Sequence, residues 1–419
     1  MIKKDRYDAV IVGGGAAGMS AALKLSEEGY KVVILERENV LGGILIQCIH
    51  TGFGLKEFKE ELAGPEYAER YKRLIENNKN ITVLLNSTVI EIKAENNEKD
   101  IFVLSSEKGV IQIKSKVLIF AAGSRERNRG EIEIDGTRPA GIFTAGYVQR
   151  IMNLYGYMPG EKVVILGSGD IGLIMARRLT WTGAKVLGVI EINAYPSGLP
   201  RNISQCLNDY NIPLYLNHTV TEIYGKNRIE AVKVTPVKEG RYLMDKSFIM
   251  ECDTLLLSIG LLPEVELLKK INVDINPSTK GPYVNSFYMT NIDGIFVCGN
   301  ALHIHDIVDY VSEEGRRTGE FASLYLKNKV NTKEVDIIAD KNVKYLLPNK
   351  ISLERDNFIF MRSMLVKNKG EIVIKKENNE IISKIKRLYF NPAEMIKFKI
   401  KKEILKNINQ NDKVIVSIE

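Results

Sequence analysis

The stretch YDAVIVGGGAAGMSAALKLSEEGYKVVILERE, residues 7–38, decides the fold of the N-terminal part of the chain. A run of β-branched residues precedes a glycine-rich turn, an alanine-rich segment follows to about Gly29, and a second β-branched run ends at Glu36. Because β-branched residues favour strands and alanine favours helix, the stretch predicts strand, helix and strand in that order. The chain therefore opens with a complete βαβ unit.

The turn of this unit carries three glycines, Gly13, Gly15 and Gly18, in the spacing G-x-G-x-x-G. The first glycine permits a tight turn, the second lets the backbone approach a pyrophosphate, and the third lets the helix pack on the strand. The N-terminus of the helix attracts the phosphate charge, and Glu36 lies where a carboxylate accepts hydrogen bonds from ribose hydroxyls. The alternative is that the glycine turn is purely structural. In that case Glu36, at the end of the second strand, has no role in binding.

The same pattern returns in EKVVILGSGDIGLIMARRLTWTGAKVLGVIEIN, residues 161–193. Gly167, Gly169 and Gly172 repeat the glycine spacing, and Glu191 ends the second predicted strand. The alternative is that this second unit is a degenerate copy of the first and is kept only for its packing in the fold. A carboxylate at this strand end favours a free 2′-hydroxyl and repels a 2′-phosphate, so we expect NAD(H) in preference to NADP(H).

Composition excludes several other classes of protein. The 419 residues, 45% of them hydrophobic, are enough for two or three domains. Four widely spaced cysteines give no disulfide framework, zinc site or iron–sulfur site, so a reducing, cytoplasmic setting is expected. The net charge of +7 comes from the C-terminal part, where lysines are interleaved with acids, which does not predict nucleic-acid binding. No apolar run is long enough to predict a transmembrane segment.

A third segment, TNIDGIFVCGNALH at residues 290–303, resembles the closing motif of the flavoproteins that bind two dinucleotides. Across roughly residues 5–330 the chain resembles the FAD- and NAD(P)-dependent pyridine nucleotide-disulfide oxidoreductase family, which includes glutathione reductase and thioredoxin reductase. In that family a strand returns to the first domain after the second has been inserted, and its last acid binds the flavin's ribityl chain. Asn300 replaces that aspartate here.

The resemblance implies the cofactors FAD and NAD and a set of binding residues for each. The residues expected to bind FAD are Gly13, Gly15, Ala16, Ala17, Gly18, Glu36, Arg37, Gly43, Val89, Ala122, Gly123, Gly299, Asn300 and Val311. The residues expected to bind NAD are Gly167, Gly169, Asp170, Ile171, Gly172, Glu191 and Gly260.

The resemblance and the strand patterns together predict an α/β fold with two Rossmann-like dinucleotide-binding domains. The FAD domain, residues 1–126 and 290–330, is interrupted by an NAD domain at residues 127–289. Beyond about Asn331 the sequence changes to Lys- and Asn-rich alternating segments. This pattern predicts a separate, mostly β C-terminal domain at residues 331–419.

A closer resemblance covers GGILIQCIHTGFGLKEFKEELAGPEYAER, residues 42–70, and CGNALHIHDIVDYVSEEG, residues 298–315. These segments resemble a branch in which the flavoprotein accompanies a separate glycerol-3-phosphate dehydrogenase of the anaerobic, FAD-dependent type and a small Cys-rich protein. The α subunits of opine oxidase and dye-linked proline dehydrogenase are similar. The resemblance implies a partner dehydrogenase subunit and a small Cys-rich partner.

Cys48 and His50 are the candidate catalytic residues, and they stand where a disulfide reductase would carry two cysteines. Cys48 has no sequence neighbour with which to form a disulfide, so its alternatives are single-thiol redox chemistry, shaping of the flavin face, or plain packing. His50, like His303 and His305, falls in a segment that the fold brings to the flavin, where one of them would move a proton. No carboxylate–histidine spacing accompanies them, so no metal is expected.

The sequence thus predicts an FAD-dependent oxidoreductase that transfers hydride between NAD(H) and FAD and exchanges electrons with a partner dehydrogenase of the glycerol-3-phosphate type. One alternative is a free-standing NADH oxidase or thiol-disulfide reductase that uses Cys48. Another is a non-catalytic subunit that binds FAD and a nucleotide for assembly.

Overall fold

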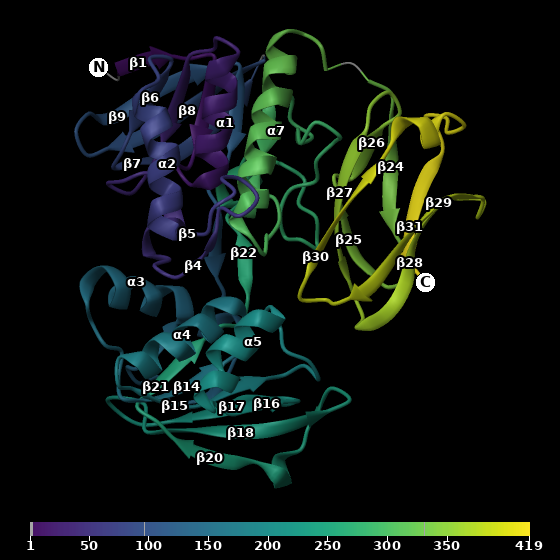
Figure 1. Cartoon of the computed structure of the whole chain (residues 1–419). Helices are drawn as coiled ribbons and strands as arrows, with labels where there is room; N and C mark the ends of the chain where they lie inside the picture. The colour runs from purple at the N-terminus through teal and green to yellow at the C-terminus, as the bar shows by residue number, and fades with distance from the viewer. Residues whose placement is uncertain (1–2, 96, 331) are drawn as a thin grey trace. The chain divides into compact units, whose positions relative to one another are not determined.

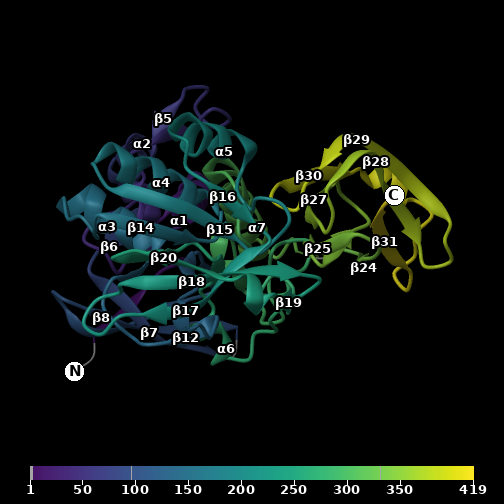
Figure 2. The ribbon, with the colours of Figure 1, turned by 90° about the horizontal axis from the view of Figure 1, so that it is seen from below.

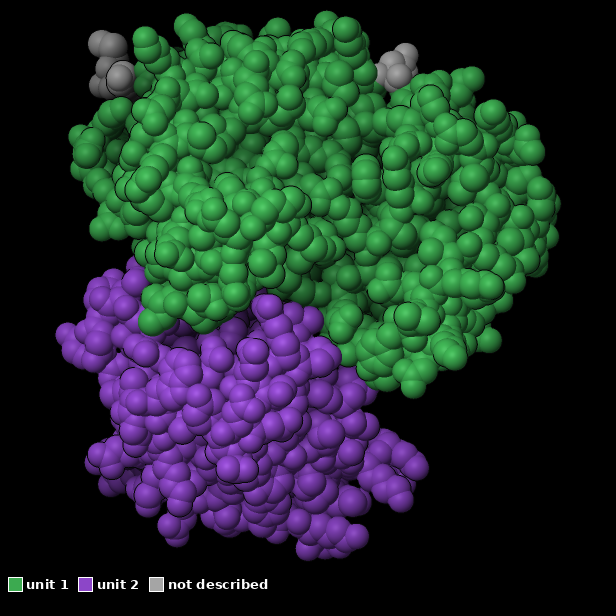
Figure 3. Space-filling view, viewed as in Figure 1, with its two compact units in different colours: residues 1–124, 263–419 green, residues 125–262 purple. Residues whose placement is uncertain are grey.

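The computed structural model describes residues 3–95, 97–330 and 332–419, and these divide into two compact units (Figure 3). Unit 1 comprises residues 1–124 and 263–419, and unit 2 comprises residues 125–262. Strands β11 (Ser124–Glu126) and β22 (Leu261–Pro263) lie where the chain passes from one unit to the other.

The centre of unit 1 is a five-stranded, fully parallel sheet in the order β23-β10-β2-β3-β6. Its strands are β2 (Ala9–Val12), β3 (Val32–Leu35), β6 (Ile81–Leu84), β10 (Val117–Phe120) and β23 (Ile295–Val297). Four of the five are buried along their whole length, as expected for a parallel sheet covered on both faces. β23 follows unit 2 in the sequence and returns to the sheet of unit 1, as the resemblance predicts.

Helices α1 (Ala16–Glu27) and α7 (Val308–Leu326) pack side by side in unit 1 (Figure 1). Small residues make this contact possible. A Cβ on Gly315 would lie 2.2 Å from the Ala17 carbonyl oxygen, and one on Gly319 would lie 2.6 Å from the Ala21 carbonyl oxygen. The two backbones therefore approach more closely than larger side chains would allow.

The remaining elements of unit 1, apart from its C-terminal region, flank the parallel sheet. They are β1 (Lys3–Arg6), β7 (Ser87–Glu95), β8 (Glu98–Ser105) and β9 (Gly109–Ser115), which form a four-stranded sheet, the short pair β4 (Thr51–Phe53) and β5 (Leu62–Ala63), and the helices α2 (Gly64–Glu76) and α6 (Glu266–Lys269). Single-turn 3₁₀ helices occupy Gly43–Gln47 and Gly299–Ala301.

Unit 2 repeats the design with its own five-stranded parallel sheet, in the order β13-β21-β14-β15-β16. The strands and helices of this layer are β13 (Ile142–Thr144), β14 (Lys162–Leu166), β15 (Lys185–Glu191), β16 (Leu214–Leu216), β21 (Thr254–Leu257), α3 (Ala145–Tyr155), α4 (Asp170–Trp181) and α5 (Pro200–Cys206). The second sheet holds β12 (Asp135–Gly136), β17 (His218–Tyr224), β18 (Ala231–Lys238), β19 (Arg241–Tyr242) and β20 (Phe248–Glu251).

The C-terminal region of unit 1 is made of strands with one short 3₁₀ helix at Lys402–Leu405 (Figure 2). One sheet has the order β26-β24-β31-β28-β29 and the other β25-β27-β30. The strands are β24 (Glu334–Ala339), β25 (Val343–Leu347), β26 (Lys350–Ser352), β27 (Asn357–Ser363), β28 (Lys367–Lys376), β29 (Ile381–Phe390), β30 (Met395–Ile400) and β31 (Lys413–Ile418). Both sheets contribute to one apolar core of their own, in agreement with the predicted β-rich region.

The α/β fold with two Rossmann-like sheets is confirmed, whereas the three-domain division at the predicted limits stays a prediction. Residues 263–289 were assigned from the sequence to the NAD domain but belong to unit 1, and the compact units do not separate the C-terminal region from it. Asn331, the predicted start of that region, lies outside the described residues. Among the residues that are described, no helix is long and apolar enough to cross a membrane.

Candidate dinucleotide sites and a buried histidine cluster

The first glycine loop connects β2 to α1, and its three glycines have the separate roles that the sequence predicts. Gly13 has φ +103°, and a Cβ there would lie 2.3 Å from the Ala121 carbonyl oxygen. A Cβ on Gly18 would lie 1.9 Å from the Gly13 carbonyl oxygen. Beside Gly15, in contrast, no atom lies within 4 Å of the position of a Cβ. The loop therefore leaves open space at the second glycine, where a pyrophosphate would approach.

The N-terminus of α1 borders this space and has no side-chain cap. Ala16 and Ala17 are its first residues, so their N–H groups have no partner within the helix. Gly43 lies against the loop, since a Cβ on it would be 3.2 Å from the Gly15 Cα. These features suit an anionic group held by backbone N–H donors, and the residues present fit the pyrophosphate of FAD.

Glu36 directly follows β3 and fixes the loop from the other side. One carboxylate oxygen accepts the Gly14 N–H at 2.7 Å, and the other accepts the Glu38 N–H at 2.8 Å. A carboxylate offers about four acceptor sites, so two remain for ribose hydroxyls. The neighbouring Arg37 side chain is exposed.

The other residues expected at FAD lie in three surrounding segments of unit 1. Ala122 and Gly123 follow β10, and Val89 lies in β7, whose first residue donates its N–H to the Glu36 carbonyl oxygen. Gly299 begins the turn after β23, and a Cβ on it would lie 2.8 Å from the Ala17 Cβ and 3.4 Å from Val311. The structure thus brings Gly299 and Val311 to the start of α1.

Asn300 follows Gly299 in the position where the family has an aspartate. Its side-chain oxygen accepts the backbone N–H of His305 at 3.1 Å. The amide therefore organises the segment that leads to α7, and its role towards a flavin stays a prediction.

The second loop, in unit 2, has the same backbone form. Gly167 has φ +92°, and a Cβ on it would lie 2.2 Å from the Ser258 carbonyl oxygen. A Cβ on Gly172 would lie 2.5 Å from the Ser258 Cβ. The Ser258 hydroxyl also accepts the Gly172 N–H at 3.1 Å. Ser258 is a loop residue that the sequence reading missed, because no glycine or acid marks it.

Two acids of unit 2 are already engaged by protein groups. Asp170, the first residue of α4, accepts the Leu199 N–H at 2.8 Å and the Asn202 amide at 2.6 Å, so its carboxylate holds α5. Glu191 is buried and accepts hydrogen bonds from three nearby residues. They are Ser168 through its N–H and hydroxyl, Asn193 through its N–H and amide, and Ser197 through its hydroxyl.

The remaining residues expected at NAD, Ile171 and Gly260, lie beside this loop or after the neighbouring strand. Ile171 is the second residue of α4. Gly260 follows β21 with φ +103°. A left-handed φ of this size is one that glycine adopts without strain.

Cys48 directly follows the 3₁₀ turn at Gly43–Gln47 and contacts the first residue of α2. Its thiol donates to the Ile44 carbonyl oxygen at 3.2 Å, and its own carbonyl oxygen accepts the Gly64 N–H at 2.8 Å. Burial raises the pKa of the Cys48 thiol to about 12. The described cysteines, including Cys206, Cys252 and Cys298, are all free thiols. The structure therefore offers no dithiol at Cys48 and no thiolate near neutral pH.

His50 lies apart from the other histidines of unit 1. Its Nδ1 is 3.2 Å from the Thr51 carbonyl oxygen, and its ring is 4.9 Å from that of Phe53. The segment that follows is fixed by Asp309 at the start of α7, whose carboxylate accepts the N–H groups of Lys56 and Glu57 at 3.0 and 2.8 Å. Asp309 is a second residue that the sequence analysis did not single out.

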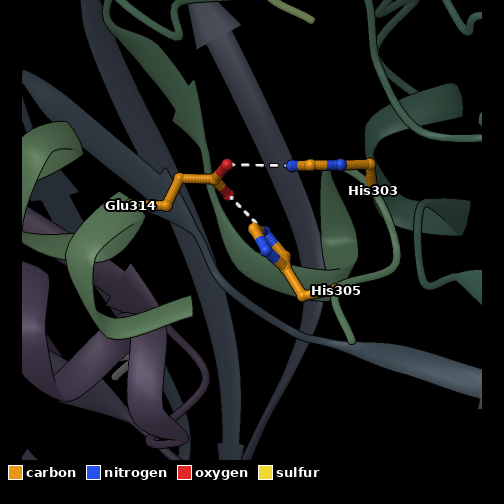
Figure 4. Close-up of side chains that lie close together, drawn as sticks. All are labelled: His303, His305 and Glu314. Atoms are coloured by element: carbon orange, nitrogen blue, oxygen red, sulfur yellow. Dashed lines mark hydrogen bonds and ion pairs between the residues drawn. The ribbon is translucent and has the colours of Figure 1, made fainter. Parts of the chain in front are cut away.

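His303, His305 and Glu314 form a buried cluster (Figure 4). The Glu314 carboxylate lies between the two rings, with one oxygen 3.0 Å from His303 Nε2 and the other 3.2 Å from His305 Nε2. The expectation of no metal rests on spacing in the sequence, and it stays a prediction; in the structure a carboxylate lies beside these histidines. It arrives from α7, nine residues after His305.

Electrostatics in the cluster keep the imidazole of His303 neutral and Glu314 ionised. Burial, followed by the neighbouring His305, lowers the pKa of His303 to about 4. The pKa of Glu314 is lowered although burial alone would raise it, because the two histidines favour the carboxylate form. The Gly299 N–H adds a hydrogen bond of 2.6 Å to the same carboxylate.

Most of the chain matches one known protein family. The sequence profile described as pyridine nucleotide-disulphide oxidoreductase matches residues 7–317. Hydrogen cyanide synthase subunit HcnB of Pseudomonas protegens is 27% identical over 293 residues, which cover 65% of this chain and 60% of the relative. NADH oxidase of Methanocaldococcus jannaschii is 25% identical over 321 residues, covering 73% and 65% respectively. The chain thus spans less than two thirds of the length of these relatives.

Two solved structures share the fold. Thioredoxin reductase of T. acidophilum superimposes with a TM-score of 0.63 at 23% identity, covering 77% of this chain and 99% of that one. L-proline dehydrogenase from P. horikoshii gives a TM-score of 0.55 at 20% identity, covering 78% and 59% respectively. At these identities the likeness concerns the fold alone. The region beyond residue 317 lies outside the matched profile.

Proposed function

Because the chain belongs to the pyridine nucleotide-disulphide oxidoreductase family, whose members bind FAD and use NAD(P)H, we propose that it transfers hydride between NAD(H) and FAD and exchanges electrons with a partner dehydrogenase. The observation that carries this proposal is the pair of glycine loops, each with its buried acid, on two separate parallel sheets. A structural turn alone does not require open space beside Gly15.

FAD, when bound, supplies a flavin that accepts hydride and passes electrons on. The protein's share is binding and orientation. The Gly15 backbone and the N-terminus of α1 would hold the pyrophosphate, and Glu36 would accept hydrogen bonds from the ribose. Gly299 and Val311 lie near the start of α1 and would help to hold the same cofactor.

NAD(H) is the proposed nucleotide of unit 2, in preference to NADP(H). Glu191 is buried at the end of β15, and its negative charge repels a 2′-phosphate whether or not the ribose hydroxyl displaces one of its present donors. Protein donors already fill the acceptor sites on Glu191. The preference for NAD(H) over NADP(H) therefore rests mainly on the negative charge of Glu191 and less on a hydrogen bond to the ribose.

A partner protein is the proposed second redox centre. Burial raises the pKa of the Cys48 thiol, and the described cysteines form no disulfide that would carry electrons to a small thiol substrate. The relative in Pseudomonas protegens is itself named a subunit. Together with the motifs at residues 42–70 and 298–315, this favours a glycerol-3-phosphate-type dehydrogenase as partner, with a small Cys-rich protein.

A second candidate is a free-standing NADH oxidase, favoured by the relative of that name. This activity needs no second protein, since oxygen takes electrons from reduced flavin. The thiol-disulfide version of this candidate is opposed by the pKa of Cys48, which burial raises to about 12. A non-catalytic subunit that binds FAD and a nucleotide would keep the same open space beside Gly15, and it is distinguished by failing to pass hydride from NADH to flavin.

The test is anaerobic reduction of the purified protein by NADH, followed by co-expression with a dehydrogenase of the glycerol-3-phosphate type. We expect flavin bleaching by NADH, dye-linked activity of the isolated chain, and a stable complex in which substrate oxidation is coupled to NAD. Rapid turnover of oxygen or of a disulfide by the isolated chain, without complex formation, would contradict the partner. Failure of NADH to bleach bound flavin would contradict the hydride transfer itself.

A further inference from the structure

The cluster of His303, His305 and Glu314 is not used by the proposed function. Its three side chains are fully buried, and one ligand atom from each lies within 4.8 Å of the others. Burying an ionised carboxylate is costly unless it is paired or coordinates a metal. The cluster thus encloses a carboxylate whose described side-chain partners are two imidazole rings.

We propose that His303, His305 and Glu314 bind a divalent transition-metal ion of the zinc class. Two imidazole nitrogens and one carboxylate oxygen form a ligand set that suits zinc and iron(II), whereas magnesium and calcium prefer oxygen ligands throughout. Three protein ligands also leave a coordination position for water or another small ligand.

The surroundings of the cluster resemble the outer shell of a metal site. The carboxylate is oriented by the Gly299 N–H, and Tyr345 places its hydroxyl 3.5 Å from His303 Nδ1. Metal-ligating histidines commonly use their second nitrogen in this way, which fixes the ring. His305 Nδ1 is buried with no hydrogen-bond partner among the described residues, so of the two ring nitrogens only Nε2 is held by a described residue.

Metal binding requires only a change of tautomer in the histidines. Because an ionised carboxylate only accepts hydrogen bonds, we assign each Nε2 that faces Glu314 as a donor. With a metal at Nε2, the proton of that nitrogen moves to Nδ1, where His303 can donate it to Tyr345. The rings and the carboxylate then need only small shifts, because the donor atoms already converge.

The C-terminal region shields the cluster from solvent. The ring of Phe360 in β27 lies 5.2 Å from that of His303 and 5.8 Å from that of His305. Arg362 in the same strand forms an ion pair with Asp306, directly after the second histidine. A metal here would be enclosed, so it would exchange slowly and remain bound during purification.

The first test is metal analysis of the full-length protein, purified without chelator and again after dialysis against Zn²⁺ or Mg²⁺ and desalting. We expect about one zinc or iron per chain and no retained magnesium. His305→Ala and Glu314→Gln should lower the bound metal at least tenfold. His218→Ala is the matched control, because the fourth histidine lies in β17 of unit 2 and is not a member of the cluster. Equal metal in all four proteins, or none in zinc-treated wild type, would overturn the proposal.

The second test needs no variant and therefore holds even if the substitutions impair folding. X-ray absorption at the zinc edge should show only nitrogen and oxygen neighbours, at about 2.0–2.2 Å, with the scattering pattern of imidazole. Sulfur neighbours at about 2.3 Å would place the metal on cysteines and overturn the site. Because neither readout involves NADH or flavin, failure here is distinct from failure of the proposed redox function.

Discussion

The two glycine loops have nearly the same backbone, but their acids are in different states. Glu36 accepts two backbone N–H groups and keeps acceptor sites free. Glu191 accepts five hydrogen bonds, from Ser168, Asn193 and Ser197, so its carboxylate is saturated. One sequence pattern therefore has two different uses in this protein. Glu36 remains available to a ligand, whereas Glu191 mainly holds the shape of its own loop.

The largest effect is expected when the open space at the second glycine is filled. Gly15→Ala places a methyl group where no protein atom lies within 4 Å, at a φ of −78° that alanine adopts freely. The protein should fold but lose FAD affinity about 100-fold, which corresponds to about 2.7 kcal/mol. Isothermal titration of the apoprotein and a thermal melt measure the two properties separately.

The matched control is Gly169→Ala in the other loop, which should weaken NADH binding and leave FAD bound. Its methyl group would lie 3.0 Å from the Ser258 hydroxyl, so that side chain must move slightly. If Gly15→Ala retained full FAD affinity, the first loop would not be the pyrophosphate site.

A smaller effect is expected from neutralising the saturated acid. Glu191→Gln removes the negative charge and introduces an NH₂ group that faces donors, so unit 2 should be destabilised by about 1–3 kcal/mol. The preference for NADH over NADPH should narrow about tenfold, measured by stopped-flow flavin reduction with both donors. Glu36→Gln is the control and should leave that preference unchanged. An unaltered preference in Glu191→Gln would mean that its role is confined to the loop.

A still smaller effect is expected from making the second loop more like the first. Ser258→Ala removes the hydroxyl that accepts the Gly172 N–H, and Ala121 occupies the matching position against Gly13. The same hydroxyl donates a long hydrogen bond of 3.4 Å to the Gly169 carbonyl oxygen. The loss of these two hydrogen bonds should lower the free energy of unfolding by about 1 kcal/mol. NADH affinity should change less than about threefold, a change near 0.6 kcal/mol. A much larger loss of affinity would assign the hydroxyl to the ligand.

The smallest effect is expected outside both loops, at Cys48. Cys48→Ser should leave NADH-to-dye electron transfer within about twofold, because dyes take electrons from flavin without a thiol. With a pKa of about 12, the thiolate fraction at Cys48 rises about tenfold for each pH unit from neutrality upward. Alkylation by iodoacetamide, followed by mass spectrometry, should show this rise without a plateau below pH 10. A plateau near pH 8 would instead favour single-cysteine chemistry.

The fold was largely predictable because its signals are local. Glycine spacing, alternating strands and the acids at strand ends all act within one βαβ unit, and they located both loops and their strands correctly. The saturation of Glu191 was not predictable, because Ser197 reaches it from a loop whose path depends on tertiary structure. Ser258 was missed for the same reason, since it arrives from β21, far along the chain.

The histidine cluster shows the limit of reading residue spacing. His303 and His305 precede α7 in an irregular segment, so no helical or strand period connects them to Glu314. A carboxylate nine residues away meets them only because the chain turns into the helix between them. The predicted end of the inserted domain at residue 289 stays a prediction, and unit 2 ends at Leu262.

The contacts of β27 with the segment before α7 make the C-terminal region part of the interior around the histidines. Phe360 lies against His303 and His305, and Arg362 forms an ion pair with Asp306, although the family profile ends at residue 317. A chain truncated before β24 would therefore expose a buried carboxylate and two imidazole rings to water. The C-terminal region is thus a part of the fold that cannot be trimmed away without uncovering polar groups of the region that the profile matches.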